Sequence, residues 1–505
     1  MAEGKKVAGK KVAAKKVVAA AKKAPAKRVK AKKIPPPPAG PRVTIVNIIP
    51  KSLSSEINQD SEPNIAVNPK NPKQIVATAF TPDPAGGAMA PLFVSSDGGA
   101  TWTLNSIVPS DQITGDISIA FSPATNEFYA GILRFPAPPQ ETRLSILRTD
   151  NAFGSTAMTV VEDRLGVDQP FLIGGVSNVG GLDRVYVGDN DLASPAPKTS
   201  TVDVCLDARQ AVARFKALRV DAVAGSGQNG PQVRPACHPD GTVYVGFYRW
   251  LSRVGDWQGN TLVVTADAVL VRDDHGATGA VTFADLQDTD GSPGRRLAAG
   301  VKFPFHSTGL GVPGQQRRGG DLAVAVDPAD SAVVYVSWSA VETGHGHTLH
   351  LQRSANRGQT WTELLTIHEA INPSIAVNDS GKVAFLYQQL TGTAAHPRWD
   401  THVQISQDAA FAHWSDTMLA TVPADAPSVA RPTGFDPYIG DYTGMVSVGR
   451  SFFGVFCANN TPDPANFPQG VTFQRSHDMT SRKLLDRLGR EVKVSIDPFF
   501  FSVTP

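Results

Sequence analysis

Residues 62–80 read EPNIAVNPKNPKQIVATAF. A polar residue opens a short apolar run, Asn-Pro interrupts it, and a second apolar run follows, which predicts a β-hairpin. Clear copies of this pattern are GDISIAFSPATNEFYAGIL from Gly115, PQVRPACHPDGTVYVGFY from Pro231, GDLAVAVDPADSAVVYVSW from Gly320 and NPSIAVNDSGKVAFLYQQL from Asn372. Weaker copies are DQPFLIGGVSNVGGLDRVYVGD from Asp168 and GDYTGMVSVGRSFFGVFC from Gly440. The chain is therefore expected to be built from seven copies of one unit.

A third strand usually follows each hairpin, as in LSILRT from Leu144 and LHLQRS from Leu349. Repeats of about 50 residues with almost no helical pattern predict an all-β propeller of radially arranged four-stranded sheets. Seven blades are favoured, with six as the alternative. Residues 43–49 and 492–503 are expected to close the ring. The one predicted helix spans residues 481–488 and ends at Gly489.

Two turns share a second pattern. Residues 95–102 read SSDGGATW and residues 354–361 read SANRGQTW, with a longer copy at 406–414 and a remnant at 476–478. The residues that carry the pattern are Ser95, Asp97, Gly99 and Trp102 in the first turn, and Ser354, Asn356, Gly358 and Trp361 in the second. Glycine permits the turn, the acid and hydroxyl bind turn amides, and tryptophan packs between sheets, so the expected role is architectural.

With these turns and repeats, residues 60–480 resemble the sialidase superfamily of Asp-box (BNR-repeat) β-propellers. The resemblance implies that the turns lie between third and fourth strands, away from the ligand face. A sialidase would also need three arginines for the substrate carboxylate, a tyrosine nucleophile backed by glutamate, and an aspartate acid/base. The family's early Arg-Ile-Pro element is absent from the sequence. Candidates by position are Tyr442, Tyr438, Glu62, Asp441, Arg234 and Arg318.

Acids and amides recur at one position of the repeat. Aligning the copies on their turn puts seven residues at this position: Glu62, Asp116, Asp168, Gln232, Asp321, Asn372 and Asp441. The position opens the innermost strand, so these side chains are expected to meet at one mouth of the central channel. Such a ring would bind a cation, or a polyhydroxyl or cationic ligand. The alternative is that each side chain caps a neighbouring strand or loop through backbone hydrogen bonds.

No cofactor is certain from the sequence. Residues 288–291 read DTDG, which resembles part of a calcium loop but lacks its first and last ligands, so a looser calcium site stays open. Residues 288–320 are expected to form a long arginine-containing loop on the ligand face. His345, His347 and His350 straddle a loop-to-strand boundary without an adjacent acid to complete a site, and are not expected to bind metal.

Composition excludes several classes of protein. The 505 residues are 41% hydrophobic and 19% charged, which is typical of a folded, soluble chain. Three cysteines lie far apart and no CxxC occurs, so neither a disulfide framework nor a zinc knuckle is indicated. No apolar run is long enough to span a membrane. The N-terminus lacks the apolar core of a secretory signal, and an intracellular location is expected.

Charge divides the chain into a basic tail and an acidic body. Residues 1–34 are Lys/Ala-rich and expected to be disordered, residues 35–41 form a Pro-rich linker, and residues 42–505 form the propeller. Residues 1–33 carry a net charge of +12 and the remainder −10. The tail resembles the lysine–alanine–proline tails of linker histones and bacterial histone-like proteins, which implies nonspecific binding to nucleic acid or another polyanion. The expected contacts are Lys5, Lys6, Lys10, Lys11, Lys15, Lys16, Lys22, Lys23, Lys27 and Arg28.

Alternatives for the tail are an anionic membrane surface, an acidic protein, or no partner. For the whole chain, the leading prediction is a binding propeller that takes a glycan or protein ligand at its acidic mouth. The alternative is a glycoside hydrolase of sialidase type, an exo-sialidase. The sequence therefore leaves open whether the protein is an enzyme.

Overall fold

Antiparallel strands that follow one another in the chain also lie side by side. The computed structural model describes residues 42–110, 114–136, 142–176, 183–192, 199–221, 233–256, 261–305, 316, 318–427 and 438–505. These ranges contain six four-stranded sheets and one five-stranded sheet, besides two smaller ones. The repeated hairpins thus form the first two strands of successive sheets.

The six four-stranded sheets run in chain order. The first contains β2 (Ser61–Val67), β3 (Ile75–Phe80), β5 (Phe93–Ser95) and β6 (Thr103–Leu104). The second contains β8 (Thr114–Phe121), β9 (Phe128–Arg134), β10 (Arg143–Thr149) and β11 (Thr159–Leu165). The third contains β12 (Val167–Val176), β13 (Asp183–Asp191), β14 (Thr199–Cys205) and β15 (Lys216–Arg219). The fourth contains β16 (Arg234–Cys237), β17 (Val243–Val254), β18 (Val263–Asp273) and β19 (Arg295–Pro304). The fifth contains β20 (Leu322–Asp327), β21 (Asp330–Glu342), β22 (Gly346–Ser354) and β23 (Thr362–His368). The sixth contains β24 (Ala370–Val377), β25 (Val383–Thr393), β26 (His396–Ser406) and β27 (Trp414–Pro423).

The five-stranded sheet joins the two ends of residues 42–505. Its strands in spatial order are β28 (Gly444–Val448), β29 (Ser451–Asn459), β34 (Ile496–Thr504), β1 (Arg42–Asn47) and β30 (Thr472–Phe473). Strands β1 and β34 are antiparallel, with Val43 opposite Val503. The predicted closure by terminal strands is confirmed, and it pairs sheet edges that would otherwise be open.

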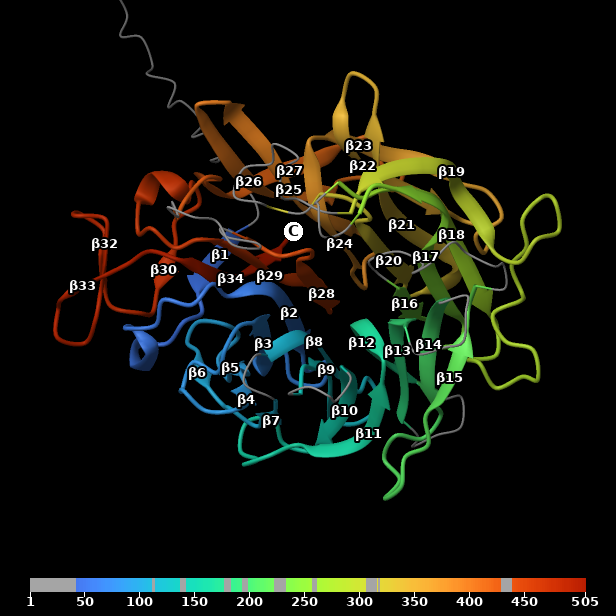
Figure 1. The fold of residues 1–505 in the computed structure, drawn as a ribbon, viewed down its shortest axis with the longest axis horizontal. Coiled ribbons are helices and arrows are strands. Elements are labelled where there is room, and N and C mark those ends of the chain that lie inside the picture. Colours follow the sequence, from blue (N-terminus) through green and yellow to red (C-terminus); the bar gives the residue numbers. More distant parts are fainter. Residues whose placement is uncertain are drawn as a thin grey trace, which may run out of the picture. The chain divides into compact units, whose positions relative to one another are not determined.

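The first strands of the sheets surround a common centre (Figure 1). Each contacts the first strand of the next sheet, and β28 contacts β2, so the series β2, β8, β12, β16, β20, β24, β28 closes on itself. Radial four-stranded sheets around a central channel define a β-propeller. The predicted fold class is confirmed.

Apolar side chains fill the space between neighbouring sheets. Val76 of the first sheet packs in one buried cluster with Ile119 of the second. Tyr335 of the fifth sheet packs in another with Phe385 of the sixth. Strand alternation places these side chains on the faces that neighbouring sheets turn toward each other. Each sheet therefore buries both of its faces, one against each neighbour.

The first tryptophan turn lies between β5 and β6. The Gly99 amide donates to Ser95 Oγ at 2.9 Å, and the Thr101 amide donates to Asp97 Oδ1 at 2.9 Å. Trp102 Nε1 donates to the Gly99 carbonyl at 2.9 Å, while the indole packs on Phe500 of the closing strand. The turn therefore ties the first sheet to the last.

The second turn, between β22 and β23, repeats these bonds. The Gly358 amide donates to Ser354 Oγ at 2.9 Å, the Thr360 amide to Asn356 Oδ1 at 2.9 Å, and Trp361 Nε1 to the Gly358 carbonyl at 3.0 Å. Asparagine replaces aspartate here because one side-chain oxygen suffices as the amide acceptor.

Two sequence predictions were wrong. Residues 481–488 form no helix, because Lys483–Leu485 is strand β32 between β31 (His477–Asp478) and β33 (Glu491–Val492). Leu484 is buried, whereas Asp486 accepts turn hydrogen bonds from the Leu488 and Arg490 amides. Residues 288–320 are not one long loop either, since Arg295–Pro304 is strand β19. Both segments have alternation too weak to predict strands, and sheet pairing decides their structure.

The remaining elements are short. They are the 3-10 helices η1 (Lys51–Leu53) and η3 (Pro464–Asn466), and the paired strands β4 (Met89–Ala90) and β7 (Val108–Pro109). Within the described ranges, no helix is long and apolar enough to cross a membrane.

Candidate functional site

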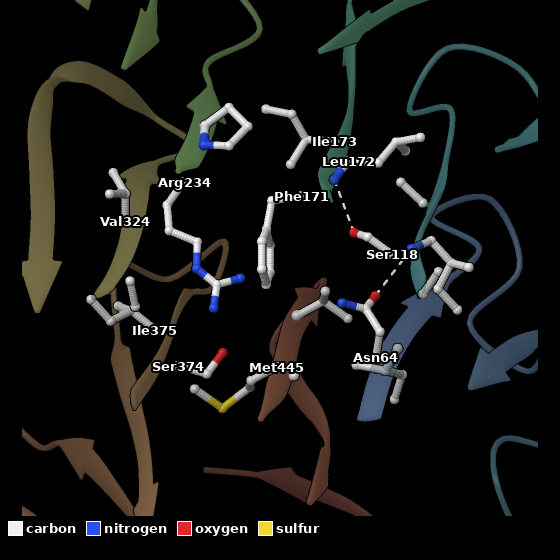
Figure 2. Close-up of a pocket in the computed structure, with 18 of the residues that line it drawn as sticks. Asn64, Ser118, Phe171, Leu172, Ile173, Arg234, Val324, Ser374, Ile375 and Met445 are labelled. Atoms are coloured by element: carbon white, nitrogen blue, oxygen red, sulfur yellow. Dashed lines mark hydrogen bonds between the residues drawn. The ribbon is translucent and has the colours of Figure 1, made fainter. Parts of the chain in front are cut away.

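The central channel contains a cavity of about 290 Å³. Residues from the first strand of every radial sheet line it, together with neighbouring Thr443. Most of the lining residues are apolar, and the polar ones are Thr443 and, labelled in Figure 2, Asn64, Ser118, Arg234 and Ser374. Two of these side chains also accept hydrogen bonds from backbone amides of the next sheet. Asn64 accepts from the Ile119 amide, and Ser118 accepts from the Leu172 amide. A cavity with few polar groups is a common form of ligand site.

Arg234 places a positive charge within this cavity (Figure 2). Its Nε donates to the Leu322 carbonyl at 3.1 Å, and its Cζ lies 2.9 Å from the centroid of the Phe171 ring. The same carbon lies 5.4 Å from the Tyr442 ring. Burial lowers the pKa of Arg234, but a guanidinium stays protonated in proteins. Two aromatic rings and a backbone oxygen therefore hold a buried cation.

Tyr438 joins two carboxylates at the start of the inner strands. Its hydroxyl lies 2.7 Å from Glu62 Oε1 and also contacts Asp441 Oδ1. All three residues are buried. Gly440 permits this approach because it has no Cβ. A Cβ at this position would lie 2.4 Å from the Glu62 amide nitrogen. The segment 438–441 is thus fitted closely onto β2.

Tyr442 makes the corresponding contact with the second sheet. Its hydroxyl donates to Asp116 Oδ1 at 3.0 Å, and its ring meets Phe171 edge-on at 5.2 Å. Burial raises the pKa of Tyr442 well above 10, and the charges of Asp116 and Glu62 raise it further. Tyr442 is therefore a stable hydrogen-bond donor and a poor source of phenolate.

Asp321 and Asn372 link three consecutive sheets. Asp321 Oδ1 accepts the Asn372 amide at 2.7 Å, and Asn372 Nδ2 donates to the Gly440 carbonyl at 3.0 Å. Asp321 Oδ2 also lies 2.9 Å from His347 Nε2. At these two ring positions, the side chains hydrogen-bond to the backbone of a neighbouring strand or loop, as the capping alternative predicts. In the sequence, His347 has no adjacent acid, because its partner Asp321 lies just before β20, 26 positions away in the chain.

The structure shifts one member of the ring by a residue. Glu62, Gln169 and Asn372 share positive φ angles of 51°, 54° and 57°, and each precedes proline at a register shift in the inner strand. Gln169, not Asp168, is therefore the equivalent of Glu62, since the bulge sets the register. The alignment failed because the third copy is matched on Gly175, outside the bulge. Gln232 lies outside the described residues.

Among the described residues, no group of three arginines lies at the candidate site, as a sialidase would need. Among these residues, the one arginine in contact with the Tyr442 ring is Arg234. Arg318 instead pairs with Glu369 at the start of the sixth sheet. The resemblance implied three arginines around one substrate carboxylate.

The other predicted sites lie elsewhere. In the 288–291 loop, Asp288 pairs with Arg295 and Arg296, and Asp290 pairs with Arg296 at 2.7 Å. The carboxylates that a looser calcium site would use thus already have cationic partners. The basic tail lies outside the described residues.

No protein-family model and no curated protein matches the chain. Among solved structures, it is similar to the α-L-arabinanase of Penicillium chrysogenum complexed with arabinobiose, at 14% identity and TM-score 0.40, over 68% of this chain and 93% of that one. It is similar to the GH93 α-L-arabinofuranosidase of Fusarium graminearum with arabinobiose, at 11% identity and TM-score 0.43, over 69% and 98%. It is also similar to YCF48 bound to D1 peptide, at 12% identity and TM-score 0.39, over 85% and 96%. At such values, the propeller assignment rests on this chain's own strand pairing.

Proposed function

We propose that the propeller is a binding module of the sialidase superfamily that takes a glycan at its channel mouth. The observation that carries the proposal is the convergence of Tyr438, Glu62, Asp441, Tyr442 and Asp116 from three sheets. Phenol donors beside carboxylate acceptors match the hydroxyl groups of a sugar. The tryptophan turns support the superfamily assignment, since they lie between third and fourth strands, as the resemblance implies, and make the turn hydrogen bonds that their residue types predict.

Three features favour binding over hydrolysis. Tyr442 holds its proton strongly, because burial and two carboxylates raise its pKa. The Tyr438 hydroxyl already contacts two carboxylates. The described part of the chain brings a single arginine onto the Tyr442 ring. A protein ligand at the same channel mouth is the second candidate for a binding module.

One distance favours a glycoside hydrolase as the alternative. Tyr438 and Glu62 lie 2.7 Å apart, which is the pairing that a tyrosine nucleophile and its glutamate base require. Asp116 and Asp441 are then the carboxylates available as acid/base. In this alternative, Arg234 is the first of the arginines that hold the substrate carboxylate.

Glycan binding by the full-length protein tests both functions. An immobilised panel of sialylated, arabinosylated and uncharged glycans should retain the wild type, while Asp116→Asn and Glu62→Gln should each lose about tenfold or more in affinity. Tyr335→Phe is the matched control, because its hydroxyl contacts Arg353 away from the channel. Turnover of a fluorogenic sialoside that Tyr438→Phe abolishes would establish the hydrolase instead. Absence of glycan binding and of turnover would overturn both.

We further propose that the tail binds polyanions nonspecifically. The proposal is supported by a net charge of +12 within residues 1–33, against −10 for the remainder. Closely spaced lysines neutralise phosphates without reading bases.

A further inference from the structure

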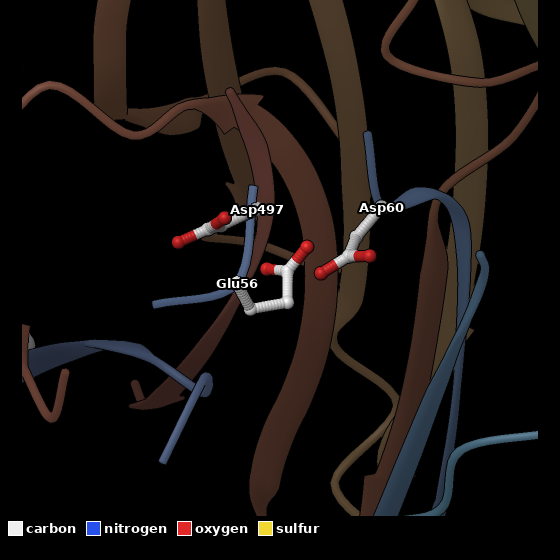
Figure 3. A group of neighbouring side chains, drawn as sticks. All are labelled: Glu56, Asp60 and Asp497. Atoms are coloured by element: carbon white, nitrogen blue, oxygen red, sulfur yellow. The ribbon is translucent and has the colours of Figure 1, made fainter. Parts of the chain in front are cut away.

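A group of three carboxylates includes none of the channel-mouth residues described above. Glu56 and Asp60 precede β2, and Asp497 belongs to the C-terminal strand β34. One oxygen of each lies within 4.8 Å of the others. Asp60 and Asp497 are fully buried, and the side chain of Glu56 is 5% exposed. Figure 3 shows the Glu56 carboxyl group between those of Asp497 and Asp60.

Asp60 sets this group apart from an ordinary buried ion pair. It is 0% exposed, and neither of its carboxylate oxygens has a hydrogen-bond partner among the described residues. Glu56 Oε2 likewise has no hydrogen-bond partner among the described residues. The Thr81 hydroxyl is near enough to favour ionised Asp60, but its geometry falls short of a hydrogen bond. Burying an unpaired carboxylate costs several kcal/mol, so the cluster must either take up protons or be matched by positive charge.

Arg475 supplies only part of that charge. Its Nη1 lies 2.9 Å from Asp497 Oδ2 and 3.9 Å from Glu56 Oε2, and no ion pair joins it to Asp60 in the described part. Asp497 also accepts from Asn47 and Asn460. Three carboxylates and one guanidinium leave a net charge of −2 when all are ionised. A divalent cation would balance this charge.

We propose that Glu56, Asp60 and Asp497 bind a Ca²⁺ ion that locks the closure of the propeller. All donors are oxygens, and calcium takes carboxylate oxygens at about 2.3–2.6 Å, so two ligands on opposite sides lie about 4.6–5.2 Å apart. Three oxygens that all lie within 4.8 Å of one another are close enough to share one such ion. Thr81 Oγ1, which is buried and without a partner among the described residues, is a further oxygen for the shell.

The position of the ion gives it a structural role. Glu56 and Asp60 lie in the segment between β1 and β2, and Asp497 lies on β34, the strand that pairs with β1. The ion would therefore connect the two ends of the propeller at the sheet where the ring closes. A ligand bound only by the folded state stabilises that state.

Calcium content and thermal stability of the full-length protein test the proposal. After purification without chelator, elemental analysis should find about one calcium per chain, and EDTA should lower Tm by about 5 °C, reversibly on adding about 1 mM Ca²⁺. Asp60→Asn and Glu56→Gln should abolish this calcium-dependent shift. Asp478→Asn is the control, because its carboxylate serves an exposed turn, and it should keep the shift.

Two outcomes would overturn the site. A wild-type protein with no bound divalent ion and the same Tm in EDTA and Ca²⁺ would mean that protons neutralise the cluster. A calcium-dependent shift that survives both Asp60→Asn and Glu56→Gln would place the ion elsewhere, for example at the channel mouth. If one variant fails to fold, the other variant and the wild-type titration still decide the question.

Discussion

The hydroxyl of Tyr438 lies 2.7 Å from Glu62 Oε1, although 376 positions separate the two residues in the chain. The contact joins the segment before the last inner strand to the start of the first one. Closure of the ring therefore creates the mouth of the channel, and the stability of the fold and the geometry of the candidate site depend on the same residues.

Tyr438→Phe should destabilise the protein by about 1–3 kcal/mol, because it removes the phenol hydroxyl that contacts two buried carboxylates. Urea denaturation monitored by tryptophan fluorescence measures the change. Tyr335→Phe, which removes a hydroxyl in contact with Arg353 at 3.4 Å, should cost less than about 1 kcal/mol. Equal losses for the two variants would contradict a special role for the Tyr438 contact.

Gly99→Ala should be much more damaging than Gly98→Ala. Both glycines have positive φ angles, 91° and 83°, so both substitutions introduce backbone strain of about 1–2 kcal/mol. A Cβ on Gly99 would lie 2.1 Å from the Phe500 ring, whereas one on Gly98 meets nothing within 4 Å. The clash should add about 1–3 kcal/mol to the first variant alone. Similar Tm values for the two variants would show that Phe500 moves freely. Such a result would contradict the tight packing of the first turn on the closing strand.

His350 should stabilise the fold at acidic pH and lose this effect as pH rises. Burial opposes its protonation, but Glu363 and Glu342, each 3.1 Å away, outweigh burial and raise its pKa above 6.5. The folded state thus holds the proton more tightly than the unfolded chain. The contribution is complete below about pH 6.5 and disappears through the higher folded pKa.

His350→Gln should accordingly lower the free energy of unfolding by about 0.5–1 kcal/mol more at about pH 5.5 than at about pH 9. Thermal unfolding at the two pH values measures the difference. His396→Gln, at an exposed position, is the control against which the effect of His350→Gln is compared. A larger effect at the alkaline pH would reverse the assigned sign.

Binding of the full-length protein to duplex DNA should weaken steeply between about 50 and 200 mM salt, with a log–log slope of about −0.9 per phosphate contact. Changing the base sequence should scarcely matter. A full-length variant with the ten basic residues named above replaced by glutamine should lose the binding and the slope. Unchanged binding by this variant, or a flat salt response, would leave the tail without a nucleic-acid partner.

The repeated hairpins determined the fold class without help from the tertiary structure. In residues 62–80, the alternation of apolar residues and the Asn-Pro turn act within a few positions, so a local pattern suffices to predict them. The tryptophan turns are local for the same reason, since Ser95, Asp97 and Trp102 bond within eight residues of chain. The terminal strands were predictable because a ring of sheets needs closing.

The site depended on information that the local pattern does not hold. An inner-strand bulge moved Gln169 into the place expected for Asp168, because strand pairing fixes register only when two strands meet. His347 reached Asp321, and Asp497 reached Glu56 and Asp60, only when separate strands were packed together. Alternation predicts which face of a strand is buried, whereas the contacts between buried polar groups depend on the order, register and closure of the sheets, and the tertiary structure alone decided those.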